Sequence, residues 1–154
     1  MTRANPQDLQ LVRVNRYEEL PQGIDRSSLC LFLHESLKPF NDTLPDIEAG
    51  LDYAFSPEAG KGGFVVLALD DKRPVGALVM LDTGMKGYVP AHLLLFVAVD
   101  PSMRGKGLGR RIVERALADC EGPVKLHVEY DNPAKRLYER IGFSSKYAEM
   151  RFER

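Results

Sequence analysis

Several features that define specialised protein classes are missing from this sequence. Only two of its 154 residues are cysteine, and no spacing of cysteine and histidine resembles a zinc site, so we expect no metal. Cys30 and Cys120 lie in apolar patterns typical of helices, which favours buried thiols in a reducing cytoplasm over a disulfide. No apolar run approaches about 18 residues and no signal-peptide core is visible, so we expect a cytoplasmic protein with no membrane partner.

Neither sign of charge is in excess. The sequence has 21 lysine and arginine residues against 22 aspartate and glutamate residues, a formal net charge of −1. This balance argues against a nucleic-acid-binding surface as the main function. The apolar content of 44% and the charged content of 28% are ordinary for a globular protein, and the length suits one domain over residues 1–154.

The most informative stretch runs from residue 93 to residue 111. Residues 93–99 form an unbroken apolar run, whose length and valine content predict a strand buried on both faces. A glycine-rich segment follows, and from Leu108 onward apolar residues recur at spacings of three and four, which predicts an amphipathic helix. The order is therefore buried strand, glycine loop and helix.

This arrangement predicts a site for an anion. The first turn of a helix presents unpaired N–H groups and the positive end of the helix dipole. Three glycines without a Cβ let a ligand approach the backbone, namely Gly105, Gly107 and Gly109. Positive charge at the same place comes from Arg104, Lys106, Arg110 and Arg111. We therefore expect a phosphate ligand here, and a pyrophosphate in particular.

The common nucleotide-binding patterns do not fit this loop. The dinucleotide fingerprint fails because Arg110 stands where its third glycine belongs, and no Gly-Lys-Ser/Thr closes a Walker A loop. What remains is Arg104-x-x-Gly107-x-Gly109 after Val99-Asp100-Pro101, which resembles the acetyl-CoA loop of the GNAT N-acetyltransferase family. A helix start that merely needs a glycine turn is the alternative.

The rest of the chain reads as alternating strands and helices. Strands are expected at 9–14, 64–69, 74–81, 93–99, 124–130 and 147–152, and helices at 26–37, 44–55, 108–120 and 132–140. This order predicts an α/β fold in a single domain, with a mixed central sheet and helices on both faces. The resemblance to the GNAT family implies the same fold.

Residues 127–143 resemble the second half of the family's cofactor site. The family pattern of an asparagine, an alanine, Leu-Tyr-Glu and Gly-Phe is matched by Asn132, Ala134, residues 137–139 and residues 142–143. The spacing from Asn132 to Tyr138 is one residue shorter than in the family, and Asp131 stands at the usual spacing. Either residue can fill the asparagine position, and we prefer Asn132.

The resemblance implies transfer of an acetyl group from acetyl-CoA to a primary amine of a small molecule or peptide by direct attack, with Tyr138 assisting the leaving thiolate. With a phenol pKa near 10 and a thiol pKa near 8.5, full proton transfer costs about 2 kcal/mol. A strong hydrogen bond, or a phenol pKa lowered by a helix terminus, would offset that cost. Packing in the helix explains Tyr138 as well, because Tyr138 follows Ala134 by one helical turn.

The remaining roles follow from the same resemblance. It implies a bulge in the central strand whose freed backbone binds the cofactor arm and the carbonyl oxygen, and it implies cofactor contacts at Val97, Ala98, Val99, Arg104, Gly105, Lys106, Gly107, Leu108, Gly109, Arg110, Asn132 and Ala134. His92 and Glu129 are the candidate general bases, although a strand histidine is more often structural and a water chain can suffice.

Two matters stay open at this point. Acidic residues in the second helix region suit a cationic amine, but a solvated helix face explains them equally; they are Asp42, Asp46, Glu48 and Asp52. A non-catalytic CoA-binding or sensing module on the same fold is the main alternative function, and a binder of another nucleotide such as ATP is a third. A homodimer is common in the family, but nothing in the sequence requires one.

Overall fold

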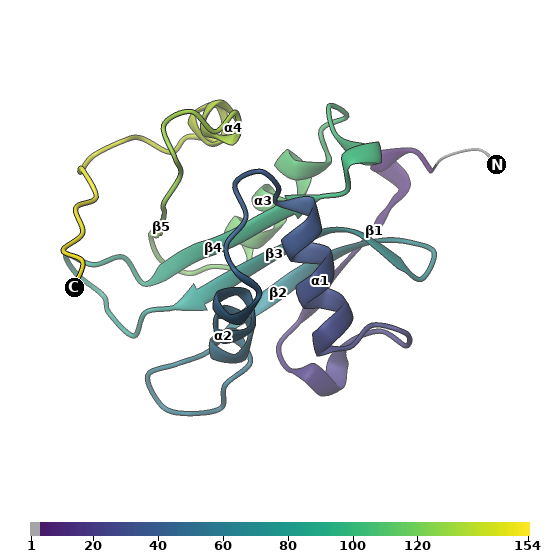
Figure 1. Cartoon of the computed structure of the whole chain (residues 1–154), viewed down its shortest axis with the longest axis horizontal. Helices are drawn as coiled ribbons and strands as arrows, with labels where there is room; N and C mark the ends of the chain where they lie inside the picture. Colours follow the sequence, from purple (N-terminus) through teal and green to yellow (C-terminus); the bar gives the residue numbers. More distant parts are fainter. Residues whose placement is uncertain (1–3) are drawn as a thin grey trace.

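The computed structural model describes residues 4–154 (Figure 1). The chain forms, in order, the short 3-10 helix η1 (Pro6–Asp8), β1 (Gln10–Val14), the 3-10 helix η2 (Tyr17–Glu19), α1 (Arg26–Ser36), α2 (Leu44–Ala54), β2 (Gly63–Asp70), β3 (Arg73–Asp82), β4 (His92–Val99), the 3-10 helix η3 (Pro101–Met103), α3 (Leu108–Ala118), β5 (Val124–Leu126) and α4 (Ala134–Ile141). The five strands make one sheet in the order β1-β2-β3-β4-β5. Neighbouring strands are antiparallel except β4 and β5, which are parallel. The predicted mixed sheet is thus confirmed.

Helices cover both faces of the sheet, as predicted. Figure 1 shows α1 and α2 in front of the strands and α3 behind them. Leu33 of α1 and Leu51 of α2 belong to one apolar cluster with alternate residues of the strands, while Ile112 of α3 belongs to a second cluster with the opposite residues. The sheet is therefore the middle layer of three, and β2 and β3 are buried on both sides.

A polar clamp joins α1 to α2. The Arg26 guanidinium donates to both carboxylate oxygens of Asp52 at 2.9 Å, and the Tyr17 hydroxyl donates to the same carboxylate. The hydrogen bond from Arg26 holds the pKa of the Asp52 carboxyl below its usual range. Asp52 is therefore occupied within the protein. The structure gives no support for a contact between Asp52 and a cationic acceptor.

The structure departs from the sequence prediction after β5. This strand has three residues instead of the seven expected, and α4 begins at Ala134. The strand predicted at 147–152 is wrong: the segment leaves the sheet and exposes most of Met150 and Phe152. In this segment, the Tyr147 ring packs against the Tyr88 ring of the β3–β4 loop, with centroids 5.7 Å apart. An alternating pattern forms a strand only where another strand offers its backbone.

Two further expectations concern compartment and redox state. Cys30 and Cys120 are both free thiols, and Cys30 is buried. Burial raises the pKa of both thiols above the ordinary value, so they stay protonated near neutral pH. Within residues 4–154, no helix is long and apolar enough to cross a membrane.

Candidate functional site

A β-bulge divides β4 into two halves. Leu94 lies opposite Met80 of β3, but the next β3 residue, Val79, lies opposite Phe96, so Leu95 is the extra residue. The bulge shows in the side chains as well. Leu93 and Leu95 pack on the α1–α2 side, and then Phe96 and Ala98 pack on that same side. Two consecutive residues thus face one layer, and the alternation starts again out of phase.

The two halves of β4 differ in their partners. Residues 92–94, the closed half, pair with β3 on one side and with Val124–Leu126 of β5 on the other. Residues 96–99, the open half, pair with β3 only; the described region of the chain places no strand on their other side. Pairing between β4 and β5 ends at Leu94, immediately before the bulge residue. The expected bulge in the central strand is confirmed.

Gly50 of α2 lets the helix lie directly on the bulge. A Cβ on Gly50 would stand 2.5 Å from Leu95 Cδ2 and 3.2 Å from Phe96 Cε2. A Cβ at the first distance would force the Leu95 side chain to move, so the absence of a side chain at Gly50 lets α2 lie against Leu95 in its present position. Sequence reasoning missed Gly50, since a helical pattern does not show which distant residues a glycine within it contacts.

The glycine loop follows the open half and has the backbone that glycine favours. Gly105 has a φ of 74° and Gly107 a φ of 84°, both in the left-handed region, and Gly107 is the N-cap of α3. No atom lies within 4 Å of where a Cβ on either residue would be, so the loop has free space beside its backbone. Gly109 is different: it is helical and only in ordinary contact with Leu137 and Val99.

The basic side chains around the loop are not equally available. Arg104 donates to the Val99 carbonyl at 3.2 Å and to the Ser36 carbonyl, Arg110 pairs with Glu114 at 2.8 Å, and Arg111 donates to the carbonyls of Pro6 and Leu9. Lys106 is exposed at the tip between the two left-handed glycines. Leu108, by contrast, is a buried core residue on α3.

The residues of the second motif lie around the start of α4. Asn132 accepts a hydrogen bond from the Ala134 backbone N–H at 2.9 Å, so its carbonyl oxygen caps the helix, while its amide group has two further donors. Val97 and Val99 of the open half join Ala134 and Tyr138 in the cluster behind the sheet. The structure therefore brings α4 to the side of β4 that lacks a strand.

Tyr138 is the buried residue of α4. Its ring packs edge-on against Phe143 with centroids 5.8 Å apart. The hydroxyl makes no hydrogen bond within residues 4–154, yet no buried side-chain polar atom there lacks a partner, so the oxygen lies at the solvent-facing tip of the ring. Burial raises the pKa of Tyr138 to about 12. The lowered phenol pKa considered above is thus wrong, and full proton transfer to a thiolate would cost about 5 kcal/mol.

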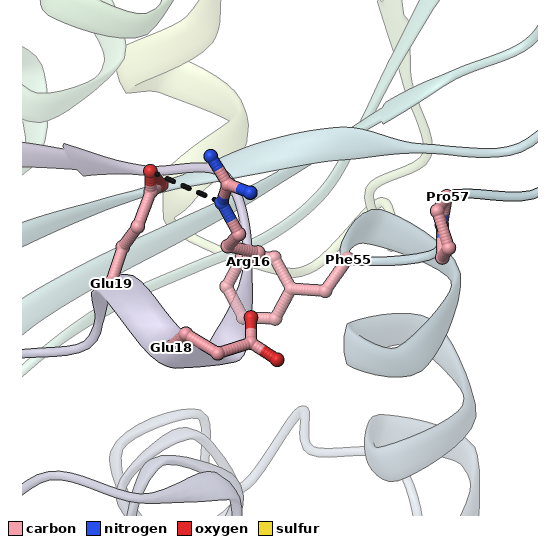
Figure 2. A pocket seen from close by; sticks show the side chains of 5 residues that line it. All are labelled: Arg16, Glu18, Glu19, Phe55 and Pro57. Atoms are coloured by element: carbon pink, nitrogen blue, oxygen red, sulfur yellow. Dashed lines mark hydrogen bonds and ion pairs between the residues drawn. The ribbon is translucent and has the colours of Figure 1, made fainter.

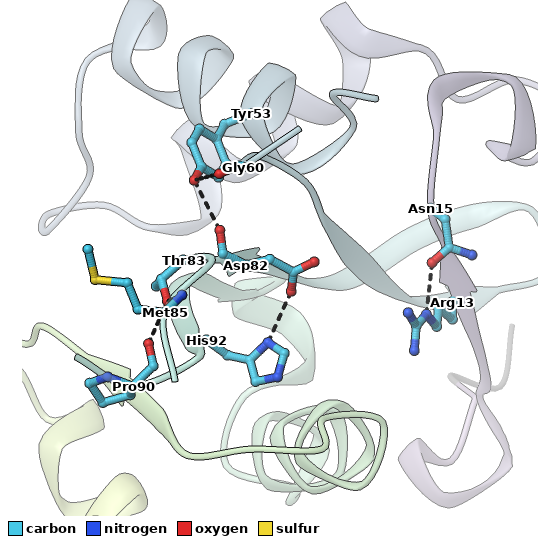
Figure 3. Close-up of polar contacts among 9 residues, drawn as sticks. All are labelled: Arg13, Asn15, Tyr53, Gly60, Asp82, Thr83, Met85, Pro90 and His92. Atoms are coloured by element: carbon cyan, nitrogen blue, oxygen red, sulfur yellow. Dashed lines mark hydrogen bonds and ion pairs between the residues drawn. The ribbon is translucent and has the colours of Figure 1, made fainter. Parts of the chain in front are cut away.

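The two candidate bases lie in different surroundings. His92 belongs to the closed half, and its Nδ1 lies 3.0 Å from Asp82 Oδ1, as Figure 3 shows. It lines a hollow of about 670 Å³ with Asp119 and Gly122, at the end of α3 away from the glycine loop. Glu129 is exposed and lies beyond the last paired residue of β5, in the segment that leads to α4.

A second hollow, of about 530 Å³, lies beside η2, past the end of β1. Figure 2 shows Phe55 and Pro57 beyond α2 facing Glu18, Glu19 and Arg16 near η2. Since η2 follows β1 and β1 is the strand farthest from β5, this hollow is separate from the open half of β4. The geometry thus concentrates the predicted cofactor residues at the open half, the glycine loop and α4.

Comparison with known sequences identifies a family. A sequence model of the acetyltransferase (GNAT) domain matches residues 61–145, more than half of the chain. A stretch of 77 residues is 34% identical to a mycothiol acetyltransferase of Catenulispora acidiphila. That match covers 47% of this chain and 24% of the relative, so the chain spans about a quarter of the length of the curated protein it matches.

Solved structures with the same fold include several acetyltransferases. A putative acetyltransferase from Deinococcus radiodurans superposes with a TM-score of 0.64 at 23% identity, over 100% of this chain and 93% of that one. An aminoglycoside N-acetyltransferase in complex with CoA superposes with a TM-score of 0.67 at 10% identity, over 97% of both chains. At these identities the likeness shows the fold.

Proposed function

The chain belongs to the GNAT acetyltransferase family, and we propose that it transfers the acetyl group of acetyl-CoA to a primary amine of a small molecule or peptide. The observation that carries the proposal is the open half of β4, which leads through η3 to a loop of two left-handed glycines and the start of α3. An unpaired strand edge, an anion site and the buried Tyr138 meet at this place. That combination suits a long ligand with a phosphate at one end.

The glycine loop fits the pyrophosphate of CoA. The first N–H groups of α3 have no helical partners, and the space beside Gly105 and Gly107 leaves the backbone open to a ligand. Lys106 adds a mobile positive charge at the tip. The guanidinium groups of Arg104, Arg110 and Arg111 are already bound to the protein, so backbone N–H groups provide most of this site.

The open half of β4 fits the pantetheine arm, which carries two amide groups. A strand with one unpaired edge presents N–H and C=O groups that need partners. The arm can pair with residues 97–99 as a short extra strand would. In the proposed complex, one N–H of this edge near the bulge also donates to the thioester oxygen, where charge develops during transfer.

Acetyl-CoA supplies an activated acetyl thioester, and the chain's own groups move the protons. Tyr138 keeps its proton because of its raised pKa, so it serves as a hydrogen-bond donor to the leaving sulfur. For the amine proton, Glu129 is the better candidate, since it is exposed and follows β5, at the point where the pairing of β5 with β4 has ended. His92 is held by Asp82 in the closed half.

The first experiment is a thermal unfolding scan with acetyl-CoA, with ATP and without ligand. A ligand present at a hundred times its dissociation constant stabilises the folded state by about 2.7 kcal/mol. For a chain of this size, the midpoint should rise by about 5–11 °C with acetyl-CoA and not with ATP. A folded protein that shows no rise would overturn the proposal.

A non-catalytic CoA-binding module is the second candidate. The edge-on packing of Tyr138 against Phe143 favours it, because a purely structural tyrosine would sit in the same way. The two functions differ in turnover. A panel of primary amines, assayed by release of the CoA thiol, should give steady thiol production for an enzyme and none for a sensor.

A further inference from the structure

Arg104 connects two regions that are far apart in the sequence. From the glycine loop, its Nε donates to the Val99 carbonyl at 3.2 Å, and its Nη2 donates to the carbonyl of Ser36. One planar guanidinium therefore holds the end of β4 and the end of α1 in a fixed relation. The other arginines of the loop region do not reach α1: Arg110 pairs within α3, and Arg111 binds the segment before β1.

Ser36 is the last residue of α1, and it is buried. The last carbonyls of a helix have no partners within the helix and carry partial negative charge. A guanidinium is a strong donor for such a group, so Arg104 stabilises the end of α1 at its present position. Loss of that donor would leave a buried carbonyl without a partner.

The segment that follows α1, residues 37–43, joins α1 to α2, and Gly50 of α2 lies against Leu95 and Phe96 at the bulge of β4. Leu37, the first residue of the segment, and Leu44, the first residue of α2, pack in the same cluster as Leu95 and Phe96 of the bulge. The middle of the segment is held by a contact between Asn41 Nδ2 and His34 Nε2 at 3.0 Å. Figure 1 shows the segment crossing in front of β4 between α1 and α2. Under the proposed function, an acceptor that approaches β4 from the α1–α2 face would pass residues 37–43.

We propose that Arg104 is a positioning residue that couples occupancy of the glycine loop to the order of residues 37–43. A ligand that fixes the loop fixes Arg104, and Arg104 fixes the end of α1 on which the segment depends. The coupling is reciprocal: an acceptor that orders residues 37–43 must tighten CoA binding by the factor by which CoA tightens acceptor binding. This inference rests on the proposed use of the loop for CoA.

Hydrogen exchange of the full chain with and without CoA tests the coupling. CoA should slow exchange in residues 37–43 by about fivefold or more, the lower end of typical coupling between sites. Strand β1, at the far edge of the sheet, is the internal comparison, because a purely global stabilisation would slow exchange there equally. Each variant is measured at a CoA concentration that saturates it, as judged by its own unfolding midpoint.

Arg104→Gln removes the fork and should reduce the effect of CoA on residues 37–43 to less than about twofold. Arg104→Lys keeps the charge and one donor, so some of the effect should return. Arg110→Gln is the matched control, since Arg110 lies beside the same loop but bonds to Glu114. It should retain the full response of residues 37–43, whatever it does to CoA affinity.

The outcomes separate the two proposals. If CoA shifts the unfolding midpoint but residues 37–43 do not respond, or if Arg104→Gln responds like the natural chain, the coupling is overturned and the cofactor site stands. If Arg110→Gln loses the response as Arg104→Gln does, the bond to Ser36 is not the cause and the coupling is again overturned. If CoA does not bind at all, the proposed function fails, and the coupling fails with it.

Discussion

The closed and open halves of β4 contrast in their backbone and agree in their side chains. The closed half is paired on both sides, whereas the open half is paired on one, yet Leu94 in the first and Phe96 in the second are both buried. Because α2 and α3 cover the two faces throughout, the open half remains within the core. A strand can therefore offer one edge to a ligand while its side chains still hold the domain together.

Truncating the open half should cost as much stability as truncating the closed half. Phe96→Ala should lower the free energy of unfolding by about 3–5 kcal/mol, and Leu94→Ala by about 2–5 kcal/mol, because both side chains are buried. Urea denaturation measures both. A cost below about 1 kcal/mol for Phe96→Ala would show that the open half is only loosely packed.

Tyr138→Phe tests whether the open half carries chemistry. It removes only the hydroxyl at the tip of a buried ring, so turnover should fall by about 100-fold with little change in the KM for acetyl-CoA. Steady-state thiol release measures both constants. Unchanged turnover would assign Tyr138 to packing alone.

The glycine loop distinguishes two kinds of glycine beside the open half. Gly107→Ala should lower stability by about 1–2 kcal/mol, because an alanine is strained at a φ of 84°, and it should weaken CoA binding. Gly109→Ala is the control: inside α3 and in ordinary contact, it should raise stability by about 0.5–1 kcal/mol. Equal effects of the two changes would contradict the distinction.

The closed half should matter little for catalysis. His92→Gln keeps a polar side chain next to Asp82 and should change turnover by less than about threefold, whereas Glu129→Gln should reduce it by about 100-fold. The pH dependence of turnover for each variant is the measurement. A reversed order would move the base to the closed half.

The smallest expected effect is at alkaline pH. Burial raises the pKa of Tyr138 to about 12, so the folded protein keeps this phenol neutral beyond the range where a free tyrosine ionises. The stability that burial of the neutral ring provides is present below pH 10 and is lost as pH rises toward 12. Turnover should therefore fall by less than about twofold between pH 8 and pH 10. A midpoint near 10 that disappears in Tyr138→Phe would contradict this.

Sequence patterns predicted the features of the site that are local. The apolar run at 93–99 is confirmed as a strand and the periodicity from residue 108 as α3, and the glycines at 105 and 107 have the left-handed backbone of a turn. The burial expected on both faces of the strand is confirmed only in part, because residues 93, 95, 97 and 99 are half-buried. The bulge at Leu95 was expected only by resemblance, because it depends on Val79 across the sheet and Gly50 above it. Tyr138 shows another limit, since one spacing fits both packing and catalysis.

The strand predicted at 147–152 failed for a related reason. Its alternation of apolar and polar residues is a local property, but a strand also needs a free backbone edge of matching length. β5 offers only three residues. Likewise, nothing in the sequence indicated that Asp52 and Arg104 would be occupied by partners elsewhere in the chain.

The bulge at Leu95 consists of one extra residue in β4, and the pairing with β5 ends next to it. Deleting Leu95 would keep every other apolar residue of β4 in the sequence. It would let Phe96 follow Leu94 in an uninterrupted ladder of hydrogen bonds with β3. The bulge would then no longer interrupt β4 at Leu94, where its pairing with β5 now ends. For this family member, one extra residue separates an uninterrupted ladder from a strand with an unpaired edge.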